Sequence, residues 1–386
     1  MFSSRVPGAL QPNRLTQKIR EARALGRELI DLTETNPTVV GIAYPDSLLA
    51  SLSDPASARY DPHPLGLASA REAVARDYHR RGVALGADRI VLTASTSEAY
   101  SILFKLLCRP SGDSVLVPVP SYPLFDHLTA LDGVAPVPYR LEYHGRWMVD
   151  LTAVDERWDE RVRAVLAVSP NNPTGSTLTA SEVRGLAERC AARDCALIVD
   201  EVFADYPLTS DPAASPEGAT PALTFRLGGL SKSVGLPQVK LGWIALEGPD
   251  RLVDEALHRL ELICDTYLSV STPVQLAAPQ MLLEGAPVRQ QILDRVRTND
   301  AALRALAARF PSIEPLRSDA GWSAVVRVPA TRTEEELVLE LLERDGVLVH
   351  PGFFFDFAHE AFLVLSLLPD PSVFAEGVGR LLARAR

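Results

Sequence analysis

The sequence has few of the features that mark secreted, membrane-spanning or metal-binding proteins. Its 386 residues include only four cysteines, and none forms a Cys-x-x-Cys pair or joins histidines at zinc spacing. We therefore expect free thiols in a reducing compartment and no metal site. No apolar run approaches the ~20 residues of a spanning helix, and residues 1–15 lack the apolar core of a signal peptide. A cytoplasmic protein is expected.

Positive charge is also scarce. The 39 lysines and arginines are outnumbered by 49 acidic residues, giving a net charge of -10. This balance argues against nucleic acid or an anionic membrane as a partner. We find no internal repeat or low-complexity tract, and the Pro-, Ala- and Ser-rich stretch 210–220 predicts a surface loop. Hydrophobic residues make up 47% of the chain, enough for a large core split over two domains.

Strands and helices alternate through the middle of the chain. Strands are predicted at 89–93, 114–118, 134–139, 162–168, 196–200, 223–227 and 241–246, and helices at 68–81, 96–108, 124–131 and 180–192. Such spacing predicts an α/β fold with a mostly parallel sheet between helices. Ligands of such sheets bind outside the carboxyl ends of the strands.

Beyond residue 246 the pattern becomes helical and then ends in a smaller α/β unit. Helices are predicted at 251–263, 274–283, 287–310, 334–344 and 372–383, with strands at 322–328, 347–350 and 362–367. A helix at 14–25 and a strand at 29–32 precede the alternating part. We expect a large domain over 45–285 and a small domain made of 1–44 and 286–386.

Three short polar segments follow predicted strands. Lys232 lies among small residues in Gly-Gly-Leu-Ser-Lys-Ser, Asp200 ends the apolar run 196–199, and Asn172 belongs to Asn-Asn-Pro-Thr-Gly. A lysine amine can form a Schiff base with an aldehyde, and a carboxylate can keep a pyridine nitrogen protonated. Together they point to pyridoxal 5'-phosphate (PLP). Taken singly, each has a structural explanation: a loop lysine, a helix-capping acid and an Asn-Pro turn. Glu201 competes with Asp200 as the acid that binds the pyridine nitrogen.

A phosphate group needs hydrogen-bond donors and positive charge. Ser95, Thr96 and Ser97 stand between a predicted strand and a predicted helix. Backbone amides at that helix N-terminus, with hydroxyls beside them, can cradle an anion. Serine and threonine are also ordinary N-caps, so this motif is weak by itself.

Over nearly its whole length the chain resembles the class I/II aminotransferases, PLP enzymes of fold type I. The resemblance is carried by Tyr60…Gly66-Leu67-x-x-x-Arg71, Pro120-Ser121-Tyr122, Asn172-Pro173-Thr174-Gly175, Asp200-Glu201-Val202, and Ser231-Lys232 followed by Gly242-Trp243. It implies transfer of an amino group between an amino acid or amine and a 2-oxo acid, through a Schiff base on Lys232.

The resemblance also implies the remaining roles. Lys232 shuttles a proton, Asp200 binds the pyridine nitrogen, Asn172 binds the phenolic oxygen and Tyr122 stacks on the ring. Ser231 and Lys240 are further phosphate ligands implied by it. Tyr60 would reach the phosphate of a neighbouring subunit, which implies a homodimer with shared active sites.

Four positions depart from the family pattern. Lys240 replaces an arginine and keeps the charge without the bidentate fork. Gly229 stands where the family often has serine. Phe203 replaces a tyrosine that donates to the cofactor. Val364, in Phe-Leu-Val-Leu-Ser, replaces the arginine that clamps the substrate carboxylate.

Near the N-terminus, Thr35-Asn36-Pro37 replaces a Gly-x-Pro turn. Thr35 and Asn36 are candidate substrate contacts, together with Phe203, but they carry no charge. The amino-acid half of the site is therefore atypical. A PLP-dependent lyase, decarboxylase or oxidase stays open as an alternative, because the fold does not fix the reaction. A PLP-binding sensor without turnover is a third reading, and the joint presence of Lys232, Asp200 and Asn172 argues against it.

Overall fold

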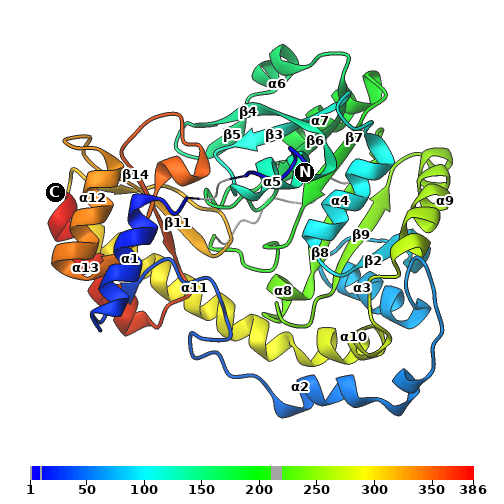
Figure 1. Ribbon diagram of the computed structural model, residues 1–386, viewed down its shortest axis with the longest axis horizontal. Helices are drawn as coiled ribbons and strands as arrows, with labels where there is room; N and C mark the ends of the chain where they lie inside the picture. The colour runs from blue at the N-terminus through cyan, green and yellow to red at the C-terminus, as the bar shows by residue number, and fades with distance from the viewer. Residues whose placement is uncertain (1, 9–10, 210–219) are drawn as a thin grey trace.

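The computed structural model describes residues 2–8, 11–209 and 220–386 (Figure 1). The surface loop predicted at 210–220 falls almost entirely outside the described residues. Within them, no helix has both the length and the apolar character needed to cross a membrane.

The larger sheet has eight strands in the described chain, in the order β2-β9-β8-β7-β6-β3-β4-β5. Its strands are β2 (Ile90–Thr93), β3 (Ser114–Val119), β4 (Ala135–Tyr143), β5 (Trp147–Val149), β6 (Val162–Val168), β7 (Ala196–Asp200), β8 (Thr224–Gly229) and β9 (Gly242–Glu247). Neighbours are parallel except where β9 meets β2 and β8 and where β5 meets β4. The predicted mostly parallel sheet is confirmed.

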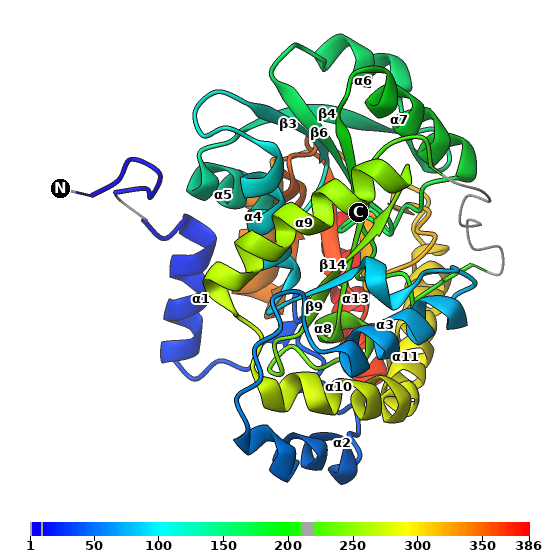
Figure 2. The same cartoon turned by 90° about the vertical axis from the view of Figure 1, so that its right-hand side faces the viewer.

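Helices cover both faces of this sheet (Figures 1 and 2). One face carries α4 (Thr96–Leu107), α5 (Leu124–Asp132) and α9 (Asp250–Tyr267), and the other carries α6 (Leu151–Arg157) and α7 (Ala180–Ala192). The alternation along β7 explains the two layers. Ala196 and Ile198 pack in the core beneath α4, whereas Leu197 and Val199 pack in the core beneath α7. Asp200 continues the first series toward α4.

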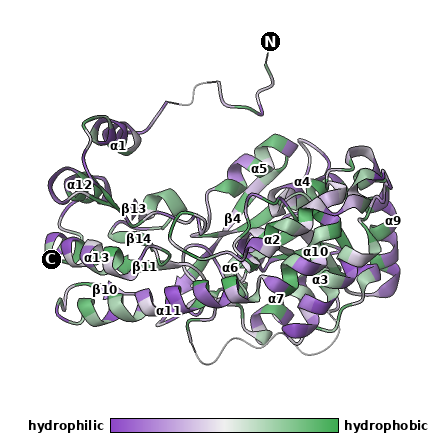
Figure 3. Cartoon of the chain, turned by 90° about the horizontal axis from the view of Figure 1, so that it is seen from below, coloured by the Kyte–Doolittle hydropathy of each residue, from purple (hydrophilic) through white to green (hydrophobic). Residues whose placement is uncertain are grey.

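Three helices lie beside the β2 end of the sheet. They are α2 (Asp46–Ala50), α3 (Ala68–Arg80) and α10 (Thr272–Glu284), and Figure 2 shows α2 and α10 running together below the sheet. Hydrophilic residues dominate α1 and the outer side of α9 in Figure 3, as expected for helices with one solvated face.

A second, four-stranded sheet lies beside the first, in the order β10-β11-β14-β13. Its strands are β10 (Glu314–Pro315), β11 (Ser323–Arg327), β13 (His350–Pro351) and β14 (Phe362–Ser366), and β1 (Ile30–Asp31) pairs separately with β12 (Val347–Leu348). Around them are α1 (Arg14–Ala24), α11 (Ala286–Ala307), α12 (Glu334–Glu340) and α13 (Pro371–Ala385). Figure 1 shows α11 running from the first sheet to the second.

Most predicted elements agree with the structure to within a few residues. The predicted helix 334–344 is interrupted, because α12 ends at Glu340 and a π-helical turn, Leu341–Asp345, follows it. The predicted strand 134–139 is too short, because β4 continues to Tyr143 where it pairs with β5. The short elements β5, α6 and α8 (Leu230–Ser233) were not predicted.

Candidate active site

Lys232 lies in the short helix α8, directly after β8. The pairing of β8 with β9 continues to Gly229 and Gly242, and the Leu230 amide donates to the Leu241 carbonyl at 2.9 Å. Gly228 has no room for a side chain, because a Cβ there would lie 2.4 Å from the indole nitrogen of Trp243. The turn that presents Lys232 is thus fixed by the strand pair beneath it.

Two aromatic rings face the amine of Lys232. Its Nζ lies 4.9 Å from the centre of the Trp322 ring and 5.6 Å from that of Phe203. Burial lowers the pKa of Lys232, and the carboxylate of Asp200 opposes this shift. A lowered pKa increases the fraction of neutral amine, which is the nucleophilic form.

Asp200 is buried at the carboxyl end of β7. Its carboxylate accepts hydrogen bonds from the Tyr100 hydroxyl at 2.9 Å and the Val202 amide at 3.1 Å. Burial raises its pKa to about 6, although these hydrogen bonds and Lys232 act in the opposite direction. Among the described residues no cationic group forms an ion pair with it, so the charged form is poorly compensated.

Glu201, the competing acid, is paired with arginine side chains. It forms ion pairs with Arg226 and, at 3.7 Å, with Arg81. Arg226 continues the network to Glu247 at 3.0 Å. This arrangement leaves Asp200 as the acid that faces Lys232.

Asn172 follows β6, next to β7 in the sheet. Its side-chain oxygen accepts a hydrogen bond from the Ser323 hydroxyl at 3.3 Å, and no described residue accepts from its amide nitrogen. The turn explanation is also correct: the Gly175 amide donates to the Asn171 carbonyl at 2.8 Å. Gly175 has φ +66, and a Cβ there would lie 2.7 Å from the Ala320 carbonyl oxygen.

Tyr122 lies at the same edge of the sheet, after β3. The amide of its neighbour Ser121 donates to the Phe355 carbonyl at 3.1 Å, and the Asn171 side chain reaches the Ser121 hydroxyl at 3.5 Å. These contacts hold the Tyr122 backbone beside the Asn172 turn. Tyr122 is 48% exposed, so it is not enclosed by its own chain.

Ser95, Thr96 and Ser97 form the start of α4. The Ser95 hydroxyl caps the helix by accepting from the Glu98 amide at 3.1 Å. Glu98 in turn accepts from the Ala94 amide at 2.6 Å, which removes that amide from any anion site. The first amides of a helix lack intrahelical acceptors, so those of Thr96 and Ser97 are available to a ligand.

Ser231 and Lys240 lie in the segment that joins β8 to β9. A Cβ on Gly242 would lie 2.8 Å from the Ser95 carbonyl carbon and 3.0 Å from the Thr96 amide nitrogen. The β8–β9 turn and the start of α4 are therefore in backbone contact. Lys240 is exposed at φ +63 and forms no ion pair within the described chain.

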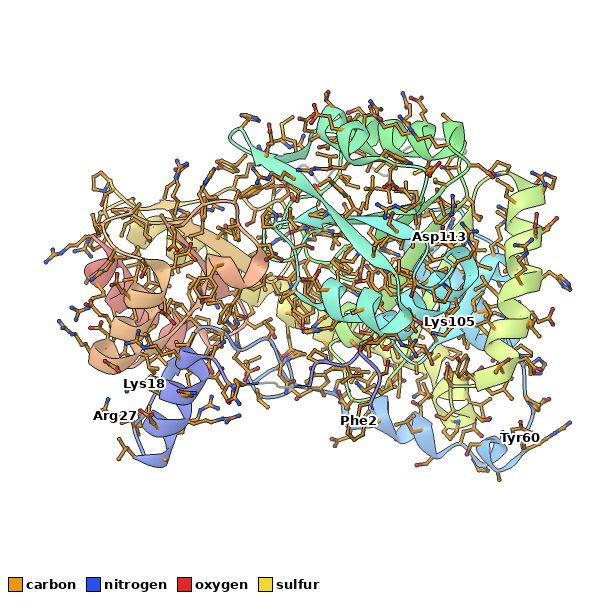
Figure 4. All side chains as sticks on the ribbon, turned by 45° about the horizontal axis from the view of Figure 1, so that its top comes forward. Phe2, Lys18, Arg27, Tyr60, Lys105 and Asp113 are labelled. Carbon is orange, nitrogen blue, oxygen red and sulfur yellow. The ribbon has the colours of Figure 1, made fainter. Side chains whose placement is uncertain are left out.

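Tyr60 is not brought to this site by its own chain. Figure 4 shows it at the edge of the molecule, and its side chain is 76% exposed. Thr35 and Asn36 lie beside the end of β14, because Ser366 donates to the carbonyls of Leu32 and Glu34 at 2.7 and 2.5 Å. The Asn36 side-chain oxygen already accepts from Thr38 at 2.7 Å.

The sequence reasoning missed three residues of this site: Tyr100, Trp322 and Ser323. Tyr100 lies one turn into α4 from the Ser-Thr-Ser cap, which is a signal that its hydroxyl faces the strand ends. Trp322 and Ser323 come from the second sheet and reach Lys232 and Asn172 from there. Nothing in their local sequence indicates this contact.

A lysine, an acid, an amide and a helix N-terminus thus converge at the carboxyl ends of parallel strands, the arrangement of a cofactor-dependent α/β enzyme. The family model for aminotransferases of class I and II matches residues 34–380, and the chain belongs to that family. It is a PLP-dependent aminotransferase with the fold type I architecture.

Curated relatives cover most of the chain at low identity. Glutamate-pyruvate aminotransferase AlaA of Haemophilus influenzae is 25% identical over 92% of this chain and 90% of its own length. Alanine aminotransferase of Mycobacterium tuberculosis is 26% identical over 95% and 87%.

Solved structures share the fold. Alanine aminotransferase from Pyrococcus furiosus superposes with a TM-score of 0.86 at 22% identity, over 96% of this chain and 95% of that one. A double mutant of Thermus thermophilus aspartate aminotransferase gives 0.86 at 23%, over 100% and 99%.

Proposed function

We propose that Lys232 holds PLP covalently and that Asp200, Asn172 and Tyr122 bind its ring. The observation that carries this assignment is the Lys232 amine, which lies against two aromatic rings with Asp200 nearby. Its lowered pKa suits both covalent attachment and the movement of a proton to and from the substrate carbon.

The contacts of these residues fit the cofactor. Asp200 is a buried carboxylate that forms no ion pair with the described side chains, and a pyridine N–H would supply a cationic partner. The Asn172 side-chain amide donates to none of the described residues and could bind the phenolic oxygen, and the half-exposed Tyr122 could stack on the ring. We assign the phosphate to the hydroxyls and amides of Ser95, Thr96 and Ser97 with Ser231 and Lys240. Once bound, the cofactor provides an electron sink.

We further propose a homodimer in which Tyr60 completes the partner's phosphate site. The Tyr60 side chain lines a hollow with Tyr267 and Leu268 at the end of α9, and Lys232 is not among the lining residues. Tyr60, Tyr267 and nearby Leu262 are 76%, 56% and 73% exposed, an apolar surface suited to a second copy. Mixing inactive Lys232→Ala and Tyr60→Ala chains should restore part of the activity if sites are shared.

For the substrate, we infer an amino acid or amine whose carboxylate, if present, is recognised without a guanidinium clamp. Val364 is buried on β14 and is paired with Val325 on β11. Thr35 and Asn36 offer uncharged polar groups beside the same strand end, and Phe203 offers an apolar wall next to Lys232. The acceptor is a 2-oxo acid. The names of the relatives make alanine and glutamate the first donors to test.

The division into domains and the location are also proposals. Residues 45–285 contain the larger sheet with its helices, and 1–44 with 286–386 contain the smaller sheets. We assign the protein to the cytoplasm on its reduced cysteines, which are all free and buried.

Two measurements test the function. Borohydride treatment of the PLP-loaded protein should fix the cofactor on the peptide that contains Lys232; a protein that gains no absorbance with PLP would refute the site. Spectra of the half-reaction with a panel of amino acids and amines should then show conversion to the pyridoxamine form. Product formation without that conversion would favour a lyase, decarboxylase or oxidase.

A further inference from the structure

The carbonyl groups at the C-terminal end of α8 are held by side chains from outside the helix. The Tyr206 hydroxyl donates to the carbonyl of Lys232 itself and lies 3.4 Å from that of Ser233. Arg289 Nε donates to the Ser233 carbonyl at 2.9 Å. A helix of four residues has few internal donors for its last carbonyls. Besides these two side chains, the Gly235 amide donates to the Lys232 carbonyl at 3.4 Å.

Both donors are themselves fixed in place. Tyr206 is fully buried, and its ring lies edge-on against Trp322 with the centres 5.1 Å apart. Arg289 is buried in the first turn of α11 and forms ion pairs with Asp77 at 3.4 Å and Asp205 at 3.5 Å. Tyr206 therefore holds the Lys232 carbonyl directly, whereas Arg289 holds the Ser233 carbonyl and is joined to the Tyr206 segment through Asp205.

We propose that Tyr206, supported by Arg289, is a positioning residue for Lys232. The inference rests on the proposed role of Lys232 and adds a residue to it. Phe203 stands where the family pattern has a tyrosine. Three residues later, the hydroxyl of Tyr206 donates to the backbone carbonyl of the lysine. Tyr206 acts through that backbone and does not touch the cofactor.

The physical reason is preorganisation. Lysine has a long, flexible side chain, and ordering it costs conformational entropy when Nζ must occupy one position. Tyr206 fixes the carbonyl of Lys232, and Trp322 and Phe203 confine its amine. Part of the entropy cost is therefore met before a ligand binds. Loss of the phenol should therefore weaken any ligand that bonds to Lys232, but not a ligand that only occupies the same pocket.

Two ligands separate these cases. PLP bonds to the lysine through its aldehyde, whereas pyridoxamine 5'-phosphate carries an amine there and cannot. We expect Tyr206→Phe to lower the affinity for PLP relative to pyridoxamine phosphate by about 2- to 10-fold, the effect of one net hydrogen bond. Tyr139→Phe is the matched control, since its equally buried hydroxyl donates to the Leu166 carbonyl at 2.7 Å. That variant should leave the ratio unchanged.

The inference is overturned if Tyr206→Phe leaves the ratio of PLP affinity to pyridoxamine phosphate affinity unchanged, which includes equal weakening of both ligands. It is also overturned if Tyr139→Phe changes that ratio as much. Neither result affects the proposed function. A wild-type protein that binds neither compound would overturn the proposed function as well. If Tyr206→Phe does not fold, Arg289→Lys replaces it, because it keeps a cation beside Asp77 and Asp205 but removes the Nε donor. If Arg289→Lys lowers the affinity for PLP relative to pyridoxamine phosphate at least twofold, the inference is supported; if this ratio is unchanged, the inference is overturned.

Discussion

Asp200 carries a buried charge that destabilises the cofactor-free protein, and its replacement by asparagine tests this directly. Burial raises the pKa of Asp200 from 3.8 to about 6, which corresponds to roughly 3 kcal/mol. The folded chain therefore binds this proton more tightly than the unfolded chain. The stabilisation by the proton is complete below about pH 4 and is lost as the pH rises through about 6.

We expect cofactor-free Asp200→Asn to unfold at higher urea concentration than wild type at pH 8, by about 1–3 kcal/mol in free energy of unfolding. The amide has the same shape and retains an oxygen for the Val202 amide and a group for the Tyr100 hydroxyl. The difference should shrink as the pH is lowered toward 4. Urea unfolding at four or five pH values, with the cofactor removed, measures it.

Asp113→Asn is a control of opposite sign. Asp113 is also buried, but the guanidinium groups of Arg109 and Arg163 hold its pKa well below the usual range. Its loss should destabilise the protein at neutral pH. If Asp200→Asn destabilises the cofactor-free protein at pH 8 as Asp113→Asn does, the burial argument is wrong. If the Asp200→Asn variant is more stable than wild type but binds PLP equally tightly, Asp200 is not the partner of the pyridine nitrogen.

Three further substitutions test the remainder of the site. Val364→Arg should raise kcat/KM for simple α-amino acids relative to wild type; no gain, either alone or combined with Asp31→Asn, would mean that another group already binds the carboxylate. Gly242→Ala should weaken binding of PLP and of inorganic phosphate at least tenfold, because its Cβ would meet the Ser95 carbonyl carbon at 2.8 Å, and unchanged affinity would exclude this helix start as the cradle. Lys240→Ala should lower PLP affinity by about tenfold, with Lys240→Arg close to wild type, and equal losses in both would remove Lys240 from the phosphate site.

The elements around the cofactor site were predictable because local sequence and fold agree there. The strand β6, the helix α7 and the strand β7 begin and end at the predicted residues. The two strands, of seven and five residues, are mostly apolar, interrupted only by Arg163 in β6 and ended by Asp200 in β7, as buried parallel strands require. The helix begins after Thr179, whose hydroxyl and Glu182 form a capping box. Asp200 and Asn172 could then be placed by counting from strand ends.

The missed residues have partners that are distant in the sequence. Tyr100 bonds to a carboxylate 100 positions away, and Ser323 reaches Asn172 over 151 positions. Each has a local sequence compatible with an ordinary buried side chain. The sequence indicated Phe203 as a departure from the family pattern but did not indicate a role for Tyr206. Its hydrogen bond to the Lys232 carbonyl depends on the packing of Trp322, which comes from the other sheet.

The surroundings of Val364 are set by the strand next to it in the smaller sheet. His350 on β13 lies opposite Val364 on β14, so the two side chains share one face of the smaller sheet. Burial lowers the pKa of His350, with the charge of Asp31 acting in the opposite direction, which favours a neutral imidazole at physiological pH. An arginine at position 364 would therefore have Asp31 within reach as an alternative partner to the substrate. Val364→Arg is best compared with the double variant Val364→Arg/Asp31→Asn, because a gain confined to the double variant would identify Asp31 as the competing anion.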